Sequence, residues 1–237
     1  MAATRSRLAV AALLFACVHA RAQNVTLSGR VKLIAADKQA VASRASGVVV
    51  WLTPLDGHAP VKPRVGQLKL TQHNKSFEPH LLVVPVGSMV QFPNHDPFFH
   101  NVFSLFEGKR FDLGLYETGS SRNVSFDRPG VSYIFCNIHA EMSAVVIALD
   151  TSYYAVSTAK GEVVIPDVPS GRYELHLWYE TALPDTLKSL TREINVTEST
   201  STLGLLQIPA EPVQPHKNKY GMDYEPPAPN SPGYDHP

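Results

Sequence analysis

Apolar and polar residues alternate in short runs along most of the 237-residue chain. Residues 25–33 alternate with a period of two, and residues 47–52 form a short apolar run. Runs of the same kind recur at 81–84, 89–92, 123–126, 131–135 and 143–149. Such runs are typical of β-strands, and no stretch repeats apolar residues at the spacing of a capped helix. The pattern therefore predicts an all-β sandwich.

A second group of strand-like runs follows, at 155–157, 162–166, 173–179, 192–196 and 203–208. A section of about sixty residues buries too little apolar surface to be stable alone. We therefore expect it to pack with the N-terminal strands before residue 60. Within the first group, residues 105–122 contain three glycines and are predicted to form a long connection at one edge of the sandwich.

The first 22 residues have the pattern of a secretory signal peptide. Arg5 and Arg7 precede an apolar run, and small residues surround a cleavage point after Ala22. That run is too short to span a bilayer, and no other apolar stretch is longer. We therefore expect a periplasmic or secreted protein without a transmembrane segment. Attachment through a lipid on Cys17 is a less favoured alternative, because Phe15 stands where such sites take a small or β-branched residue.

Composition and charge exclude several classes of function. A chain with 44% hydrophobic and 18% charged residues is folded and globular. The 21 basic and 21 acidic residues balance, and removal of the signal peptide takes away three arginines. The mature chain is therefore slightly acidic and has no basic run, so nucleic acid is not expected as a partner.

The cysteine count draws attention to a single thiol. One of the two cysteines lies in the signal peptide, so the mature chain carries Cys136 alone. It has no partner for an intramolecular disulfide, and a free thiol in an oxidising compartment is a liability. One interpretation is a buried, inert cysteine that behaves as a small hydrophobic residue. The neighbouring residues favour a different one.

Cys136 begins the motif Cys136-x2-His139-x2-Met142, directly before the apolar run. Sulfur ligands combined with imidazole suit copper, and a His2Cys set with a weak axial Met is typical of blue-copper electron-transfer sites. The second histidine that this set requires has a candidate in His100, which follows a strand and a bend. Zinc would favour more Cys or His ligands and no thioether. A Cys–His nucleophile pair lacks a third, orienting group.

These motifs resemble those of a known family. Residues 77–149 are similar to the cupredoxins, and within them to the amicyanins, in the His100-Asn101-Val102 segment and in the short interval between Cys136 and Met142. The resemblance implies that His100, Cys136, His139 and Met142 bind one type 1 copper ion. It also implies that Asn101 links the two ligand loops and that His139 is the electron exit. His95 is interpreted as a surface residue, with a metal-binding role left open.

The rest of the chain resembles accessory modules. Residues 161–178 are similar to carboxypeptidase-regulatory-like, transthyretin-like β modules, and the whole arrangement resembles bacterial proteins labelled as methylamine-utilization proteins. The implied fold is a cupredoxin-like Greek-key sandwich packed with a smaller transthyretin-like sandwich. The expected division is a signal peptide at 1–22, accessory strands at 23–60, a cupredoxin domain at 61–150, the rest of the accessory module at 151–210 and a disordered Pro-rich tail at 211–237.

The expected function is that of a periplasmic one-electron carrier that exchanges electrons with a redox partner protein and is not an enzyme. Two alternatives stay open. The same residues could serve a periplasmic copper carrier or storage protein without electron transfer, or the loop could belong to a purely structural β module.

Overall fold

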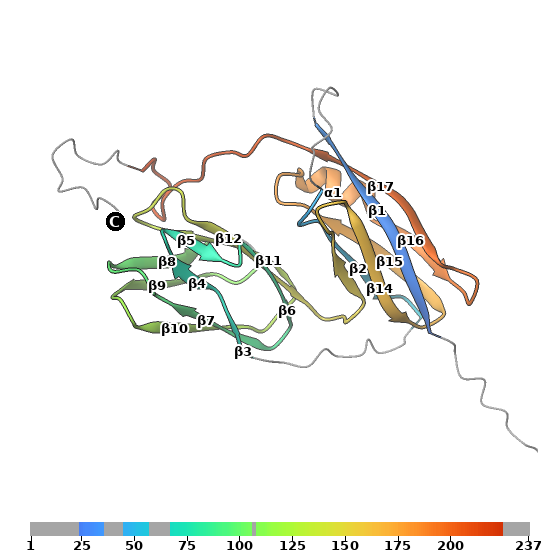
Figure 1. Ribbon diagram of the computed structural model, residues 1–237, viewed down its shortest axis with the longest axis horizontal. Helices are drawn as coiled ribbons and strands as arrows, with labels where there is room; N and C mark the ends of the chain where they lie inside the picture. Colours follow the sequence, from blue (N-terminus) through green and yellow to red (C-terminus); the bar gives the residue numbers. More distant parts are fainter. Residues whose placement is uncertain (1–23, 36–44, 57–66, 106–107, 225–237) are drawn as a thin grey trace, which may run out of the picture.

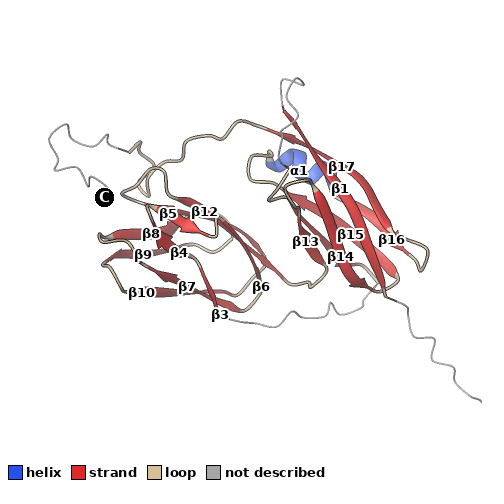
Figure 2. Ribbon diagram, in the orientation of Figure 1, coloured by secondary structure: helices blue, strands red, loops and turns tan. Residues whose placement is uncertain are grey.

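The structure is a computed structural model that describes residues 24–35, 45–56, 67–105 and 108–224. The predicted signal peptide and residues 225–237 lie outside these ranges. Regular structure in the described residues is almost entirely β-strand, with one short helix (Figure 2). The prediction of an all-β fold is therefore confirmed. No helix in this part of the chain combines the length and the apolar character that crossing a membrane requires.

The site domain, residues 67–149, is a sandwich of two sheets (Figure 1). Its strands are β3 (Gln67–Lys69), β4 (Thr71–His73), β5 (Ser76–Glu78), β6 (Leu81–Pro85), β7 (Ser88–Pro93), β8 (His100–Ser104), β9 (Phe111–Tyr116), β10 (Ser121–Phe126), β11 (Gly130–Cys136) and β12 (Ser143–Leu149). One sheet has the order β6-β12-β11-β8-β9, the other β10-β7-β3, and β4 pairs with β5. Phe92 of β7 and Ile134 of β11 are buried in the core that the two sheets share.

The flanking module consists of strands that come before the site domain in the sequence and strands that follow it. Its elements are β1 (Val25–Ala35), β2 (Val49–Pro54), β13 (Tyr154–Val156), β14 (Glu162–Val168), β15 (Gly171–Trp178), α1 (Pro184–Leu190), β16 (Arg192–Val196) and β17 (Thr202–Ala210). β1 lies between β14 and β17, and β2 lies between β13 and β15. The N-terminal strands therefore complete both sheets of the C-terminal section, and a separate apolar core lies within the module.

One local expectation was wrong. Residues 111–116 form the edge strand β9, which pairs with β8, and not a connection. Asn101 faces Leu115 while Phe103 faces Asp112, so β9 carries an extra residue in a bulge that Gly114 permits by its positive φ of 67°. The bulge breaks the alternation that would have marked a strand. Helix α1 has seven residues, too short to show an amphipathic stripe.

Strand β12 joins the two domains, which explains why its sequence is continuously apolar. One set of its side chains lies in the site-domain core, namely Ala144, Val146 and Ala148. The alternate set forms a cluster with residues of the flanking module, namely Val145, Ile147 and Leu149 beside Val49 and Trp178. Both faces of this strand are therefore buried, as is typical of central strands covered on each side.

Residues 211–224 are the part of the expected Pro-rich tail that the structure describes. They leave β17 in the flanking module and run to the site domain, where they end near the loop that follows β11 (Figure 1). The side chains of Lys219 and Tyr224 form hydrogen bonds with the site domain there. The segment contains few apolar residues, but its aromatic and charged side chains find partners far away in the sequence.

Candidate metal centre

Two neighbouring strands and one loop bring three predicted ligands together. His100 begins β8, Cys136 ends β11, and Cys136 faces Val102 across the antiparallel β8–β11 pair. His139 lies in the loop before β12. The Cys136 Sγ atom is 3.7 Å from His100 Nδ1 and 3.6 Å from His139 Nδ1, and the two Nδ1 atoms are 3.1 Å apart. These residues form the one cluster of potential metal ligands among the described residues.

The loop from Cys136 to Met142 is closed by its own backbone. The Cys136 N–H donates to the Met142 carbonyl at 3.2 Å, and the Met142 N–H donates to the His139 carbonyl at 3.2 Å. These hydrogen bonds bring the end of the loop, at Met142, back beside its beginning at Cys136. Met142 is fully buried and belongs to the same apolar core as Cys136. A thioether at this position lies in a dry environment, in the same core as the thiol.

The separations between the three donor atoms fit one metal ion. Typical metal–ligand distances are about 2.0 Å to nitrogen and about 2.3 Å to sulfur. Combined with the observed separations between the donor atoms, these distances give donor–metal–donor angles of about 100° to 120°. Such angles suit a trigonal or tetrahedral site. The donor chemistry then favours copper, because two imidazole nitrogens and a cysteine sulfur suit that metal.

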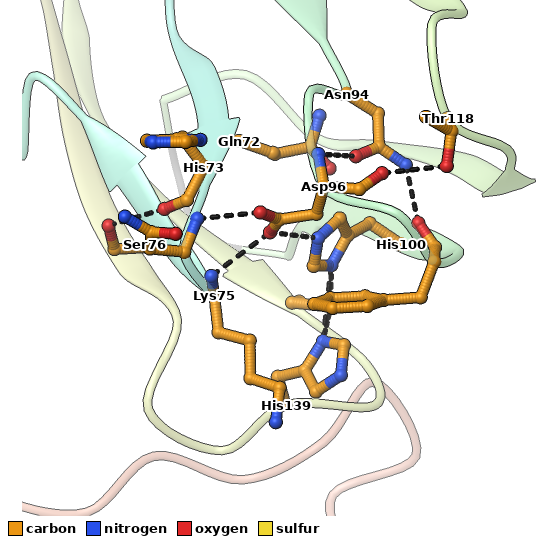
Figure 3. Close-up of polar contacts among 12 residues, drawn as sticks. Gln72, His73, Lys75, Ser76, Asn94, Asp96, His100, Thr118 and His139 are labelled. Atoms are coloured by element: carbon orange, nitrogen blue, oxygen red, sulfur yellow. Dashed lines mark hydrogen bonds and ion pairs between the residues drawn. The ribbon is translucent and has the colours of Figure 1, made fainter. Parts of the chain in front are cut away.

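Asp96 fixes the orientation of His100. Its Oδ2 atom lies 2.8 Å from His100 Nε2, and both side chains are buried (Figure 3). Burial raises the pKa of Asp96, but the N–H groups of Lys75 and Asn74 and the imidazole of His100 outweigh this, so the net pKa lies below its usual value. The carboxylate is therefore ionised and can only accept, which places the imidazole proton on Nε2. The lone pair of Nδ1 then points toward Cys136 and His139.

Burial keeps both imidazoles neutral. It lowers the pKa of His100 despite the opposing effect of Asp96. Burial and the proximity of His100 lower the pKa of His139 to about 4. Neutral imidazole is the form that binds a metal. The cluster is therefore ready to accept a cation at neutral pH without first losing protons from its histidines.

The thiol of Cys136 has a different balance. Burial raises its pKa, while backbone N–H groups of Ile138, Asn101 and His139 lower it by a smaller amount. The thiol is therefore protonated in the absence of a cation, but N–H donors already surround the sulfur. A bound cation would displace the thiol proton, and these donors would then stabilise the thiolate.

Asn101, predicted to link the ligand loops, contacts both sides of the site. Its carbonyl oxygen accepts a hydrogen bond from the Asn137 N–H at 3.1 Å, which ties β8 to the residue after Cys136. Its side-chain Nδ2 donates to Asp112 Oδ1 on β9 at 2.6 Å. The link between the loops is thus made by the main chain, and the side chain connects β8 to the edge strand.

His95, whose metal-binding role the sequence left open, lies outside the cluster. His95 is exposed, and its N–H donates to the Gln72 carbonyl, so the described contacts give it no place among the ligands. Sequence reasoning missed Asp96 entirely. The sequence Asn94-His95-Asp96-Pro97 contained a signal for a turn that would position Asp96. In the structure the Asn94 side chain accepts the Asp96 N–H, in a turn typical of Asn.

Comparisons with known proteins give only distant likenesses. No family model matches the sequence, and no curated protein does. A purple cupredoxin from Nitrosopumilus maritimus is similar in structure, with a TM-score of 0.32 and 23% identity over 35% of this chain and 99% of its own. An amicyanin mutant in the Cu(I) form has a TM-score of 0.34 and 17% identity over 42% of this chain and 98% of its own.

A copper-containing nitrite reductase from Thermus scotoductus is also similar, with a TM-score of 0.34 and 23% identity. The match covers 41% of this chain but only 25% of the reductase. Each likeness concerns the fold alone and extends over less than half of this chain.

Proposed function

We propose that the protein is a periplasmic, mononuclear type 1 copper protein that carries single electrons between partner proteins. The observation that carries this proposal is the cluster of His100, Cys136 and His139, whose donor atoms all lie within 4.8 Å of one another. Met142, buried in the same core as Cys136, would be the fourth residue that holds the ion. In this role the protein turns over no substrate of its own and is not an enzyme.

The surrounding residues suit electron exchange because they restrict movement. When bound, copper supplies a centre that accepts and releases one electron, as Cu(II) and Cu(I). His100 is held by Asp96, Cys136 by its place at the end of β11, and Met142 by the backbone closure of the loop. A rigid frame of this kind keeps the ligands in one arrangement in both charge states. Little reorganisation then opposes the transfer.

His139 is the proposed exit for the electron. His100 and Cys136 are fully buried, whereas His139 is half-buried. Its neighbour Ile138 is 46% exposed, and Phe99, next to His100, is 52% exposed. Exposed apolar side chains beside a redox centre are a suitable contact surface for a partner protein. The partner is therefore proposed to dock over His139 and its apolar surroundings.

Periplasmic or secreted location is proposed from the sequence of residues 1–22 alone, with cleavage after Ala22. The pattern supports export of the remaining chain. A lone cysteine in that compartment is best protected as a buried metal ligand, which agrees with the complete burial of Cys136.

The test is to add Cu(II) to the metal-free mature chain and to measure visible absorption and voltammetry. An intense blue colour with rapid, reversible one-electron reduction is the expected result. Copper binding without colour, followed by transfer of the ion to a chelator, would instead support the copper carrier. A chain that binds no copper would leave the structural β module as the remaining interpretation.

A further inference from the structure

The C-terminal strap, residues 211–224, reaches from one domain to the other. It follows β17, which pairs with β1 in the flanking module, and it ends beside the loop that carries Cys136 (Figure 1). The ligands themselves all belong to the site domain. The strap therefore brings residues that follow the flanking module into contact with the loop of the proposed copper site.

The strap contacts three consecutive residues around the cysteine. The Tyr224 hydroxyl donates to the Cys136 carbonyl oxygen at 2.6 Å. The Lys219 N–H donates to Asn137 Oδ1 at 3.0 Å. The ring of His216 stacks on Phe135, with centroids 4.2 Å apart and an angle of 21° between the planes. Each contact restrains the end of β11 at or next to the ligand.

The strap is also connected, through Asp112 of β9, to the strand that carries the first histidine. The Lys219 ammonium group lies 2.8 Å from Asp112 Oδ2, and Asp112 Oδ1 accepts the hydrogen bond from Asn101. Asn101 directly follows His100 in β8. Lys219 therefore joins both ligand segments, one through its backbone N–H and the other through its side chain.

The strap has internal structure that presents these groups. Asn218 forms the centre of a turn in which its side-chain oxygen accepts the N–H groups of Tyr220 and Met222. Gly221, with a φ of 77°, allows the chain to reverse there, and its N–H donates to the Asn218 carbonyl. An ion pair between Lys217 and Asp223 closes the turn. These contacts hold the loop from which Lys219 and Tyr224 reach the site domain.

We propose that the strap is a positioning element of the copper site, with Tyr224 and Lys219 as its positioning residues. It holds the end of β11 and Asn101 in the ligand arrangement before the metal arrives, so less order has to be created on binding. Hydrogen-bonded groups behind metal ligands commonly change affinity by about 10-fold to 100-fold. This assigns the flanking module a function as the anchor of the strap, and it rests on the proposed copper function.

The decisive variant is Tyr224→Phe, which removes one hydroxyl and leaves the ring that faces His216. Its matched control is Tyr179→Phe, which makes the same change beside the core of the flanking module. We expect Tyr224→Phe to release copper to a Cu(I) chelator about 10-fold faster and to shift the reduction potential. The Tyr179→Phe variant should match the unmodified chain in both measurements. Lys219→Ala should act in the same direction as Tyr224→Phe.

A measurement without metal separates this inference from the copper function. Amide hydrogen exchange at residues 137–142 of the metal-free protein should be faster in Tyr224→Phe, and faster still in a full-length chain that carries both Tyr224→Phe and Lys219→Ala. Unchanged exchange, copper release and potential in Tyr224→Phe would overturn the role of the strap while a blue full-length chain upheld the copper site. A colourless full-length chain would overturn the copper function, and the exchange rates would still decide whether the strap holds the loop.

Discussion

The site domain and the flanking module are both two-sheet β structures, but their buried residues differ in polarity. In the described part of the site domain, the buried polar residues are Gln72, Ser88, Asn94, Asp96, His100, Asn101, Ser104 and Ser132. In the described part of the flanking module they are Thr151 and Ser157. Burying a polar group is costly unless it forms hydrogen bonds. The domain that accepts this cost is the one that contains the metal-ligand cluster.

The buried polar groups of the site domain support the segment that leads to His100. Gln72 contacts the Tyr116 hydroxyl and the Phe92 carbonyl, and Asn94 donates to the Phe98 carbonyl at 2.8 Å. In the flanking module, by contrast, the Ser157 hydroxyl accepts the Val48 N–H and donates to the Ala45 carbonyl. It thereby joins its own backbone segment to residues 45–48. In the site domain, the buried polar groups therefore support the approach to the ligand cluster, whereas Ser157 joins backbone segments of the flanking module.

The largest expected effect comes from Cys136→Ser. The hydroxyl is a poor ligand for Cu(I) and forms no copper–thiolate bond, so the blue colour should be absent. The substitution is small and the position is fully buried, so far-ultraviolet circular dichroism should show an unchanged β fold. A variant that stays blue would remove Cys136 from the site.

A substitution in the core of the flanking module should instead lower the stability of that module and leave the blue colour intact. Leu175 of β15 is completely buried in that module, and Leu175→Ala should lower its free energy of unfolding by about 2–5 kcal/mol. Both tryptophans, Trp51 and Trp178, lie on its strands, so their fluorescence reports its unfolding by urea. Absorption of the copper-loaded protein below the transition should not change.

The control for Leu175→Ala is Leu205→Ala, on β17, where the side chain is 54% exposed. Its expected effect on unfolding is small, because little apolar surface is removed from a packed core. Loss of blue colour in Leu175→Ala under native conditions would contradict the division of roles between the two domains.

A smaller effect is expected from Asp96→Asn. The amide keeps the size of the side chain but loses the charge that holds the proton on His100 Nε2. Copper affinity should fall by about 10-fold to 100-fold, as for other groups that orient a histidine ligand. Competition with a chelator measures the change. Asp127→Asn makes the same substitution at a surface ion pair with Lys109 and should leave the affinity unaltered.

The sequence was sufficient for the all-β class and for three candidate ligands that the structure places together. Alternation marks strands wherever one face is buried, and Cys136 and His139 are close in sequence as well as in space. β9 could not be recognised, because the bulge at Gly114 interrupts its alternation. The strap could not be recognised either, because Tyr224 meets Cys136 across 88 positions of sequence. The role of these three candidates and of Met142 as ligands stays a prediction.

The smallest expected effect concerns the boundary between the two domains. His80 Nδ1 lies 3.0 Å from the Ser143 carbonyl oxygen, and Nε2 lies 2.7 Å from Glu180 Oε2 in the flanking module. Both partners accept, so the bridge favours the doubly protonated imidazolium. The hydrogen bond to Glu180 raises the pKa of His80 above its ordinary value of 6.5, although burial opposes it.

A histidine whose folded-state pKa is raised stabilises the protein below its ordinary pKa and loses this contribution as pH rises through the folded value. The His80 side chain is half exposed, so the contribution is at most about 1 kcal/mol. The free energy of unfolding should therefore fall slightly as the pH rises from 6.5 through the folded-state pKa of His80, and His80→Gln should remove that slope. His73→Gln, at an exposed position on β4, should keep it. An identical pH dependence in both variants would show that the bridge does not couple the two domains.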